Sequence, residues 1–465
     1  MPLRNQSDPE ILSSMNRNET VELNRRDFIG SFATLMTLLG GVELVRRAPV
    51  QAADLETLVP FQVRCGVIGL GAWGREIVAT LSRLKTAQVI AVCDTYPASL
   101  KRGTSAAPNS KGLDDYRRIL DDKDVQAVVI ATPTHQHREI ALAALQAGKH
   151  VYCEAPLANS IEDAKAIALA AKAARKQVFQ PGLQMRADPQ RRFLLDFIRA
   201  GASGKAVKAH AQWHKKQSWR MTSPNPDRER DLNWRLNKDV SLGLAGEIAI
   251  HQMDALSWFL NARPISVTGF GSLIHWKDGR DMPDTIQTIF EYPGGAQLTC
   301  ECTLANSFDA DYEVLYGTDA AIMMRGPKAW MFKEVDSPLL GWEVYARKDQ
   351  FYKETGIALI ANATKLANLT EKATDEAAYT STPLYYALES FLTNVNAVGS
   401  AVEDFTANFG TSDRAALEKY LSEIKLQLAP DFQEGFEATV LAIKASEAVA
   451  RGAKMALSKE AFELT

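Results

Sequence analysis

The sequence predicts an α/β protein whose first domain is a doubly wound parallel sheet. Between residues 60 and 182, short apolar runs alternate with helical patterns, which is typical of a parallel sheet with helices on both faces. After Gly182 the pattern changes to strands of period two joined by a hairpin turn, which predicts a second domain of a different kind at 183–465. A chain of 465 residues is long enough for two domains.

The composition excludes several classes of function. Hydrophobic residues make up 46% and charged residues 23%, as in soluble globular proteins. The net charge of −3 gives no reason to expect a nucleic-acid partner, which would favour a basic surface. The 5 cysteines are scattered without zinc-type pairing, so no metal site is expected.

Residues 1–53 are interpreted as a twin-arginine export signal. Arg25 and Arg26 precede an apolar run over 28–42, and small residues at 48–53 suit cleavage. The run is shorter than the roughly 20 residues that cross a bilayer, so no stable membrane span is expected. The predicted location is periplasmic or otherwise exported. The alternative is a cytosolic protein with a chance Arg-Arg pair.

A glycine-rich turn stands between a strand at 63–68 and a helical pattern. It reads Gly69-Leu70-Gly71-Ala72-Trp73-Gly74. Gly69 suits a tight turn, Gly71 lets the backbone approach a pyrophosphate, and Gly74 permits close packing of helix on strand. The helix start at Ala72 and Trp73 offers free N–H groups to phosphate. The sequence therefore predicts a Rossmann dinucleotide-binding domain over 60–182.

Asp94 indicates which dinucleotide is bound. It ends the second strand, where a carboxylate can accept hydrogen bonds from the adenosine ribose and repel a 2′-phosphate. NAD is therefore the expected cofactor. Lys101 and Arg102 follow closely and leave NADP open as the alternative.

Further polar residues stand where later strands end. Thr132, Pro133 and Glu154 follow two such strands, and ligands bind at the carboxyl ends of parallel strands. His135 and His137 are spaced like a pair of metal ligands. That spacing at a helix start more simply gives one capping and one solvated histidine, so metal is not expected there.

Four stretches together resemble the glucose–fructose oxidoreductase and inositol dehydrogenase family, Gfo/Idh/MocA. They are Gly69–Gly74, Thr132-Pro133 with His137, Ala147–Pro156 and Glu247–Asp254. The resemblance implies hydride transfer with a nicotinamide cofactor, which Thr132, Pro133, His137 and Glu154 would help to bind. It also implies a C-terminal α+β domain with a large open, mostly antiparallel sheet. That sheet would serve as a substrate wall and as the contact of a homo-oligomer.

Two positions depart from the family pattern. Ala155 stands where the family usually has a lysine that donates to the reacting hydroxyl, and Glu247 stands where it has an aspartate. The missing lysine puts simple alcohol dehydrogenation in question, because a positioned acid or base typically contributes 10²–10⁴-fold.

The candidate catalytic residues lie on one predicted helix, 246–260. Glu247, His251 and Asp254 have spacings that place them on one helical face. We expect His251 to exchange the hydroxyl proton and Glu247 to orient its ring. The alternative is an ordinary core histidine.

The candidate substrate residues are Arg186, Trp213 and His214. Arg186 resembles a family position near the substrate, and Trp213 with His214 combines a stacking ring with a polar donor, which suits a sugar. The alternative for this pair is an ordinary amphipathic strand. A polar loop at 223–231 is a possible lid. Residues 327–382 form an addition to the second domain, and the sequence does not indicate its function.

These patterns favour a nicotinamide-dependent oxidoreductase that acts at a secondary alcohol of a sugar, glycoside or polyol with tightly held cofactor. One alternative is an NAD-dependent glycosidase that works by transient oxidation and elimination. The other is a non-catalytic protein that keeps NAD as a structural element.

Overall fold

The computed structural model describes residues 61–340, 343, 346, 348–351, 354–359, 379–410 and 413–464. The predicted export signal at 1–53 lies outside these residues, as does part of the predicted elaboration at 327–382. All described residues belong to one compact unit. None of the described helices combines the length and the apolar character needed to cross a bilayer.

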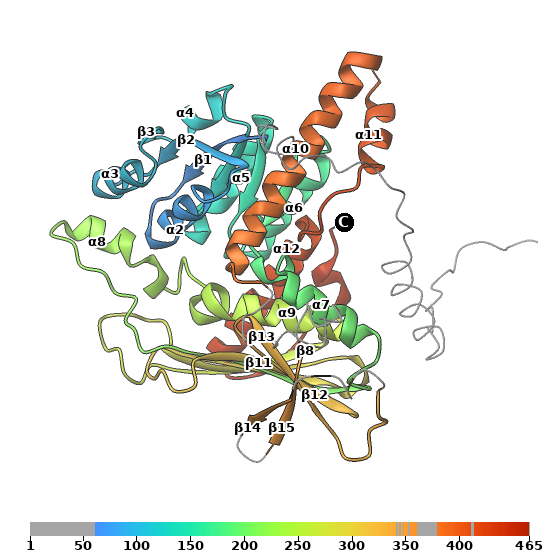
Figure 1. Cartoon of the computed structure of the whole chain (residues 1–465). Helices are drawn as coiled ribbons and strands as arrows, with labels where there is room; N and C mark the ends of the chain where they lie inside the picture. Colours follow the sequence, from blue (N-terminus) through green and yellow to red (C-terminus); the bar gives the residue numbers. More distant parts are fainter. Residues whose placement is uncertain are drawn as a thin grey trace, which may run out of the picture. The chain divides into compact units, whose positions relative to one another are not determined.

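The first sheet has six parallel strands in the order β3-β2-β1-β4-β5-β6 (Figure 1). The order reverses between β1 and β4, and ligands bind at such a switch point. The predicted doubly wound sheet is therefore confirmed. Its elements are β1 Val63–Ile68, α2 Ala72–Leu81, β2 Ala87–Cys93, α3 Pro97–Ala106, β3 Lys111–Leu113, α4 Arg117–Asp121, β4 Ala127–Ile130, α5 His137–Gln146, β5 His150–Cys153, α6 Ile161–Ala173 and β6 Phe179–Pro181.

Alternation along β1 gives this sheet two apolar faces. Val67 packs with α2 in one core cluster, whereas its neighbour Ile68 packs with α5 and α6 in the other. Successive side chains of a strand point to opposite faces, so a strand buried on both sides is apolar throughout. This is why the strands of the first domain appear in the sequence as short continuous apolar runs.

Helix α10, Pro383–Phe409, belongs to the first domain's core although it comes late in the chain. The ring of Phe391 packs edge-on against Tyr152, with centroids 5.7 Å apart. Gln180 Nε2 donates to the Ala387 carbonyl oxygen at 2.8 Å. Burial of one such aromatic or aliphatic side chain contributes about 1.5–3 kcal/mol. This helix was not predicted from the sequence. Because it packs in the core of the first domain, that domain also includes residues beyond the expected boundary between 182 and 183.

The second sheet has ten strands in the order β14-β15-β13-β12-β11-β7-β10-β9-β8-β16. Neighbouring strands are antiparallel except β7 and β10, which confirms the mostly antiparallel sheet. The strands are β7 Ala206–His214, β8 Ser266–Ser272, β9 Thr285–Glu291, β10 Gln297–Thr303, β11 Asp311–Gly317, β12 Ala320–Arg325, β13 Lys328–Lys333, β14 Lys348–Phe351, β15 Glu354–Ala358 and β16 Lys454–Ala456. Strands β13 to β15 come from the predicted elaboration, which therefore extends this sheet.

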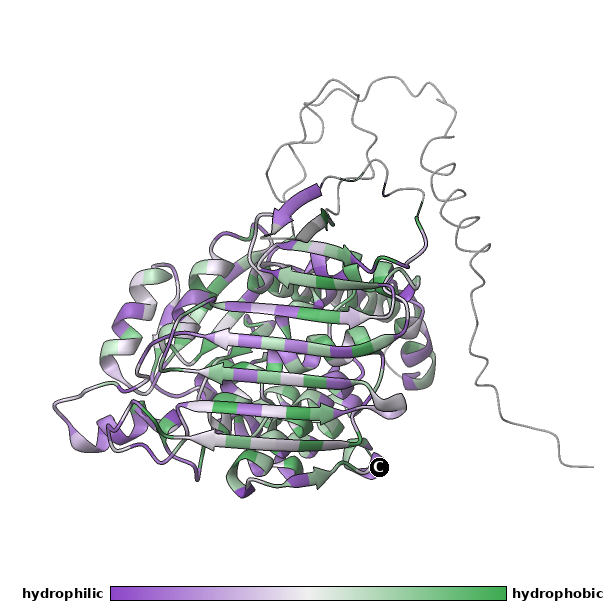
Figure 2. Ribbon diagram, turned by 90° about the horizontal axis from the view of Figure 1, so that it is seen from below, coloured by the Kyte–Doolittle hydropathy of each residue, from purple (hydrophilic) through white to green (hydrophobic). Residues whose placement is uncertain are grey.

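Helices cover one face of the second sheet, and Figure 2 shows the other face open. Ala209 and Ala211 of β7 point into the core under the covering helices. The other helices of this half are α7 Pro189–Arg199, α8 Pro226–Leu232, α9 Ile250–Leu260 and α12 Phe432–Arg451, whereas α11 Arg414–Ser422 packs against α10. Short turns are η2 Thr134–Gln136, η3 Gln184–Arg186, η4 Trp234–Leu236, η6 Pro293–Gly295 and η8 Lys459–Phe462, and η5 is a π-helix at Ala245–Ala249.

Candidate functional site

The three glycines after β1 adopt the geometry that the fingerprint predicts. Gly69 has φ +93°, a conformation that side chains rarely adopt. A Cβ on Gly74 would lie 1.9 Å from the Gly69 carbonyl oxygen, so only glycine allows this close packing. A Cβ on Gly71 would meet nothing within 4 Å. Space is therefore open beside the backbone where a pyrophosphate would approach.

Helix α2 begins at Ala72, directly after this turn, and no side chain caps its first turn. The N–H groups of the first turn have no partner within an α-helix, and the helix dipole favours negative charge there. Trp73 lies in the same turn with its side chain 39% exposed. These features fit the phosphates of a dinucleotide.

Asp94 lies at the end of β2 in a fixed orientation. Its Oδ2 accepts from the backbone N–H of Leu70 at 2.8 Å, and its Oδ1 accepts from the N–H of Tyr96 at 2.7 Å. Each carboxylate oxygen can accept a further hydrogen bond. The carboxylate is thus held beside the glycine turn and can still accept from a ribose hydroxyl.

Two buried polar atoms lie unpaired at the ends of β4 and β5, which are adjacent strands. They are Thr132 Oγ1 and Glu154 Oε1. Glu154 is only 7% exposed. Buried polar atoms nearly always have a partner, so an unpaired one calls for an explanation. A bound polar group at the carboxyl edge of the sheet explains both atoms, and Pro133 continues this edge into η2.

His137 holds the site together from inside the domain. It is buried, and its Nδ1 and Nε2 each lie 2.9 Å from a backbone carbonyl oxygen, of Pro156 and Thr132 respectively. Burial lowers its pKa to about 4. The ring thus joins the loops after β4 and β5 through both of its nitrogens.

Glu247 does not orient His251, because its carboxylate is engaged elsewhere. Oε1 accepts from the Thr134 hydroxyl at 3.1 Å, and Oε2 accepts from Arg235 Nε at 2.8 Å. Glu247 also lies in the π-helix η5, before the α-helical register of α9 begins. The predicted one-turn spacing to His251 therefore does not hold, which corrects that expectation. Burial raises the pKa of Glu247, and Arg235 opposes this rise.

His251 lies in the first turn of α9 and is partly buried. Desolvation lowers its pKa, and the nearby Asp254 carboxylate opposes this. A lowered pKa leaves the ring neutral near pH 7, so it can accept a proton. The charged residue that acts on His251 is thus Asp254 and not Glu247.

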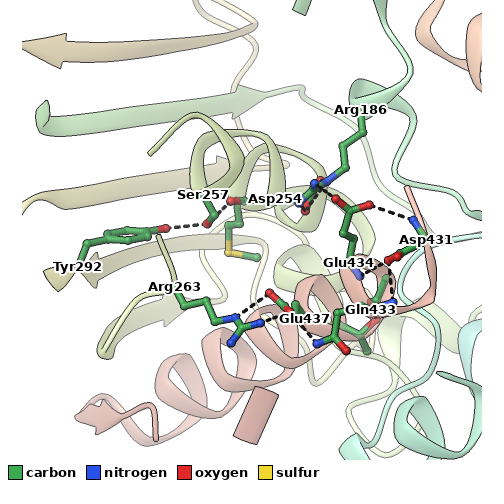
Figure 3. Close-up of polar contacts among 12 residues, drawn as sticks. Arg186, Asp254, Ser257, Arg263, Tyr292, Asp431, Gln433, Glu434 and Glu437 are labelled. Atoms are coloured by element: carbon green, nitrogen blue, oxygen red, sulfur yellow. Dashed lines mark hydrogen bonds and ion pairs between the residues drawn. The ribbon is translucent and has the colours of Figure 1, made fainter. Parts of the chain in front are cut away.

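Arg186 is fully engaged by carboxylates (Figure 3). Its Nε and Nη2 donate to Asp254 at 2.8–3.1 Å, and its Nη1 contacts Glu434 at the start of α12. Its guanidinium also lies 5.4 Å from the Trp258 ring centroid. These contacts join η3, α9 and α12. They leave Arg186 a structural role in place of the predicted contact with substrate.

Trp213 and His214 point to opposite faces of the second sheet. Trp213 packs on the helix-covered core, whereas His214 Nδ1 lies 3.1 Å from the Phe308 carbonyl oxygen. Consecutive residues of a strand cannot present their side chains to one ligand on one face. The predicted stacking-and-donor pair is therefore not formed.

Sequence reasoning missed three residues of the site, two of which bond the carboxylate of Glu247. Thr134 and Arg235 bond its carboxylate, and the Trp234 ring packs edge-on against His135 at 6.0 Å between centroids. Trp234 and Arg235 follow the polar loop at 223–231 directly, which was the one signal available. Within the described ranges, no group of three or more His, Cys, Asp or Glu side chains is placed to hold a metal ion.

Comparisons with known proteins agree with this geometry. Residues 63–181 match the family model described as the oxidoreductase family with an NAD-binding Rossmann fold. Residues 192–323 match the model of the GFO/IDH/MocA C-terminal domain. Together the two matches cover more than half of the chain.

Two curated relatives are each 30% identical to this chain. A levoglucosan dehydrogenase of Pseudarthrobacter phenanthrenivorans matches over 232 residues, which are 45% of this chain and 57% of the relative. An inositol 2-dehydrogenase of Saccharopolyspora erythraea matches over 243 residues, 51% of this chain and 66% of the relative. The chain thus spans between half and two thirds of the length of these relatives.

Two solved structures share the fold. A levoglucosan dehydrogenase in complex with NADH and levoglucosan has a TM-score of 0.62 at 20% identity, covering 85% of this chain and 99% of its own. An aldose-aldose oxidoreductase of Caulobacter crescentus, complexed with glycerol, has a TM-score of 0.60 at 17% identity, covering 85% of this chain and 100% of its own. The chain therefore belongs to the Gfo/Idh/MocA oxidoreductase family, and residues 63–181 form its NAD-binding Rossmann domain.

Proposed function

We propose that this protein is an NAD-dependent oxidoreductase that acts at a secondary alcohol of a sugar, glycoside or related polyol. The hydrogen bond from Thr134 to Glu247 carries the proposal, because it ties the segment leading into the His251 helix to the loop at the nucleotide-binding edge. The named relatives act on levoglucosan and inositol, which supports a polyhydroxylated substrate. Both are dehydrogenases, which favours this function over the glycosidase and the non-catalytic alternatives.

The chain's residues bind the two halves of the cofactor along one edge of the first sheet, on either side of β1. The turn at Gly69–Gly74 and the first turn of α2 would hold the pyrophosphate, and Asp94 would accept from the adenosine ribose. Thr132 Oγ1 and Glu154 Oε1 would bond polar groups of the nicotinamide half. Bound there, the nicotinamide supplies a hydride acceptor.

His251 would act as the base that accepts the hydroxyl proton. As the hydride leaves the alcohol carbon, the hydroxyl proton must be accepted, and Ala155 has no group that can do so. The His251 ring is neutral near pH 7 and can take this proton, and Asp254 stabilises the resulting charge. Arg186 holds Asp254 in place through its bidentate contact.

Glu154 is another titratable group at the cofactor edge. Burial raises its pKa to about 7, and the Glu247 carboxylate adds to the rise. The Trp73 side chain and the Ala155 backbone oppose it by hydrogen bonding. A Cβ on Gly182 would lie 2.4 Å from Glu154 Oε2, so the glycine makes room for this carboxyl group.

We also propose that the open face of the second sheet packs against a second copy of the chain. Phe270 and Ile289 are exposed on β8 and β9, and their paired neighbours Gln287 and Thr268 share that face. Large apolar side chains on an uncovered sheet favour association. The mass of the protein in solution, measured by light scattering, tests this proposal, and a monomer would contradict it.

His251→Ala should reduce turnover by roughly 10²–10⁴-fold, because the hydroxyl proton loses its acceptor. NAD reduction is followed by absorbance with levoglucosan and myo-inositol as trial substrates. The control is His275→Ala, which removes an exposed histidine on the loop after β8. NAD affinity should be unchanged in both variants. Equal activity of the His251 variant and the wild type would reject this role.

The gain in stability of Glu154→Gln over the wild type should grow as the pH rises from about 4.5 to 7. The folded protein keeps a proton on Glu154 up to about pH 7, whereas the unfolded chain loses it near 4.5. Burial of this carboxyl group therefore lowers stability progressively across that window, and the amide removes the loss. Tm measured from pH 4.5 to 8 should show a growing advantage of the variant. The exposed Glu76 of α2, changed to Gln, is the control. An advantage that stays constant across the window would contradict the raised pKa.

We propose that residues 1–53 direct export through the twin-arginine route, which carries folded proteins and so suits a protein that must bind its nucleotide first. Arg25 and Arg26 before the apolar run support this. Changing both arginines to lysine should retain the protein in the cytoplasm with the segment uncleaved, as judged by fractionation and mass spectrometry. Unchanged export of that variant would reject the route.

A further inference from the structure

Residues 220–236, named here the 220–236 segment, lie against the cofactor-binding edge of the first domain. The segment leaves β7 of the second sheet and contains α8 and η4. Figure 1 shows α8 near the start of α3, although more than a hundred residues separate them in the sequence. The function proposed above uses none of its contacts with the first domain.

The segment touches the first domain after β2 and after β4. The Arg228 guanidinium lies 4.3 Å from the centroid of the Tyr96 ring, and Tyr96 follows the end of β2 by three residues. The Trp234 ring packs against His135, in the turn that follows β4. In the sheet order, β2 and β4 flank β1 and its glycine turn. A dinucleotide at this switch point has its adenosine half towards β2, where Asp94 lies, and its nicotinamide half towards β4.

The segment is held in this place by its own contacts. Arg220 Nη2 and Glu229 Oε1 form an ion pair at 2.5 Å, and Arg220 Nη1 donates to the Asp278 carbonyl oxygen at 2.7 Å. The Asn233 side chain accepts from the Met221 N–H and donates to the Met221 carbonyl, both at 2.8 Å. These bonds close the two ends of the segment on each other and anchor it to the loop between β8 and β9. The 220–236 segment is therefore a preformed cover of the cofactor-binding edge.

Arg228 has hydrogen-bonding capacity that the described residues do not use. Its Nε is buried and has no partner, and its ion pair with Asp231 is long, at 3.8 Å. Its side chain is 20% exposed, against 80% for the neighbouring Arg230. A guanidinium that is stacked on one ring and has a free N–H suits a flat heteroaromatic base with a ribose hydroxyl beside it.

We propose that Arg228 and Tyr96 form a clamp for the adenosine half of the dinucleotide, and that the 220–236 segment is the cover that retains it. The proposal rests on the proposed binding of NAD. It makes Arg228, from the second domain, a binding residue for the adenosine ribose. Because Asp94 stands two residues before Tyr96, the clamp takes the ribose without a 2′-phosphate. A cofactor so covered leaves slowly.

The test measures release of ADP-ribose, which carries the adenosine half and needs no turnover. Arg228→Ala should speed release roughly three- to thirtyfold in displacement by stopped-flow fluorescence, because stacking and one hydrogen bond are lost. The release rate of Arg228→Lys should lie between those of Arg228→Ala and the wild type, because lysine keeps the positive charge but has no planar group that can stack. Arg230→Ala is the matched control on the same helix and should match the wild type.

Three results would overturn the clamp. Equal release rates in the Arg228→Ala and Arg230→Ala variants would show that Arg228 does not touch the adenosine. A larger effect of Arg228→Ala on 2′-phospho-ADP-ribose than on ADP-ribose would show that Arg228 recognises a phosphate instead. Failure of the wild type to bind ADP-ribose at all would reject the clamp together with the proposed cofactor. Thermal unfolding without ligand should be the same for both alanine variants, so misfolding does not confuse the comparison.

Discussion

The carboxylate of Glu247 is the contact on which the rest of the site depends. It is buried, and it joins the Thr134 hydroxyl of the first domain to Arg235 of the 220–236 segment. A buried carboxylate that lost either partner would be left poorly compensated, which is unfavourable in a medium of low polarity. The nucleotide loop, the cover and the start of the His251 helix are therefore constrained together by one side chain. The π-helical turn at 245–249 places that side chain where both partners can reach it.

A second constraint acts on the far side of the same helix. Arg186 binds Asp254 and Glu434, and so fixes α9 against the loop after β6 and the start of α12 (Figure 3). Asp254 in turn acts electrostatically on His251. The helix is thus held at its start through Glu247 and at its middle through Arg186. Such double anchoring keeps a catalytic side chain within the narrow range of positions that proton transfer requires.

The sequence predicted the parts of the site that depend on local pattern. The glycine turn and Asp94 follow from spacing along one strand–turn–helix–strand unit, and Thr132 and Glu154 follow from the ends of two later strands. The structure places all of them at one edge of the sheet. The family resemblance correctly implied the second sheet. The bounds of β1 were also predicted, because its apolar run is short and complete.

The errors have a common physical cause, which is that spacing identifies positions but not partners. Glu247 was paired with His251 because they are four residues apart, yet its partner Thr134 is 113 residues away. Arg186 was assigned to substrate because it resembles a family position, and no sequence pattern shows the two carboxylates that bind it. The alternation along β7 is by itself enough to show that Trp213 and His214 point to opposite faces of the sheet. Helix α10 was missed because its packing partners Tyr152 and Gln180 lie far from it in the sequence.

Hydrogen–deuterium exchange of Glu247→Gln tests most directly whether this one carboxylate couples the cover to the nucleotide loop. Glutamine keeps an acceptor for Thr134 but cannot form the ion pair with Arg235. Exchange should become faster at the backbone amides of 220–236 and of 245–251, while the amides of β1 and β4 keep their protection. Glu437→Gln, which breaks the surface pair with Arg263, is the control and should leave both segments unchanged. Unaltered exchange of 220–236 in Glu247→Gln would contradict the coupling.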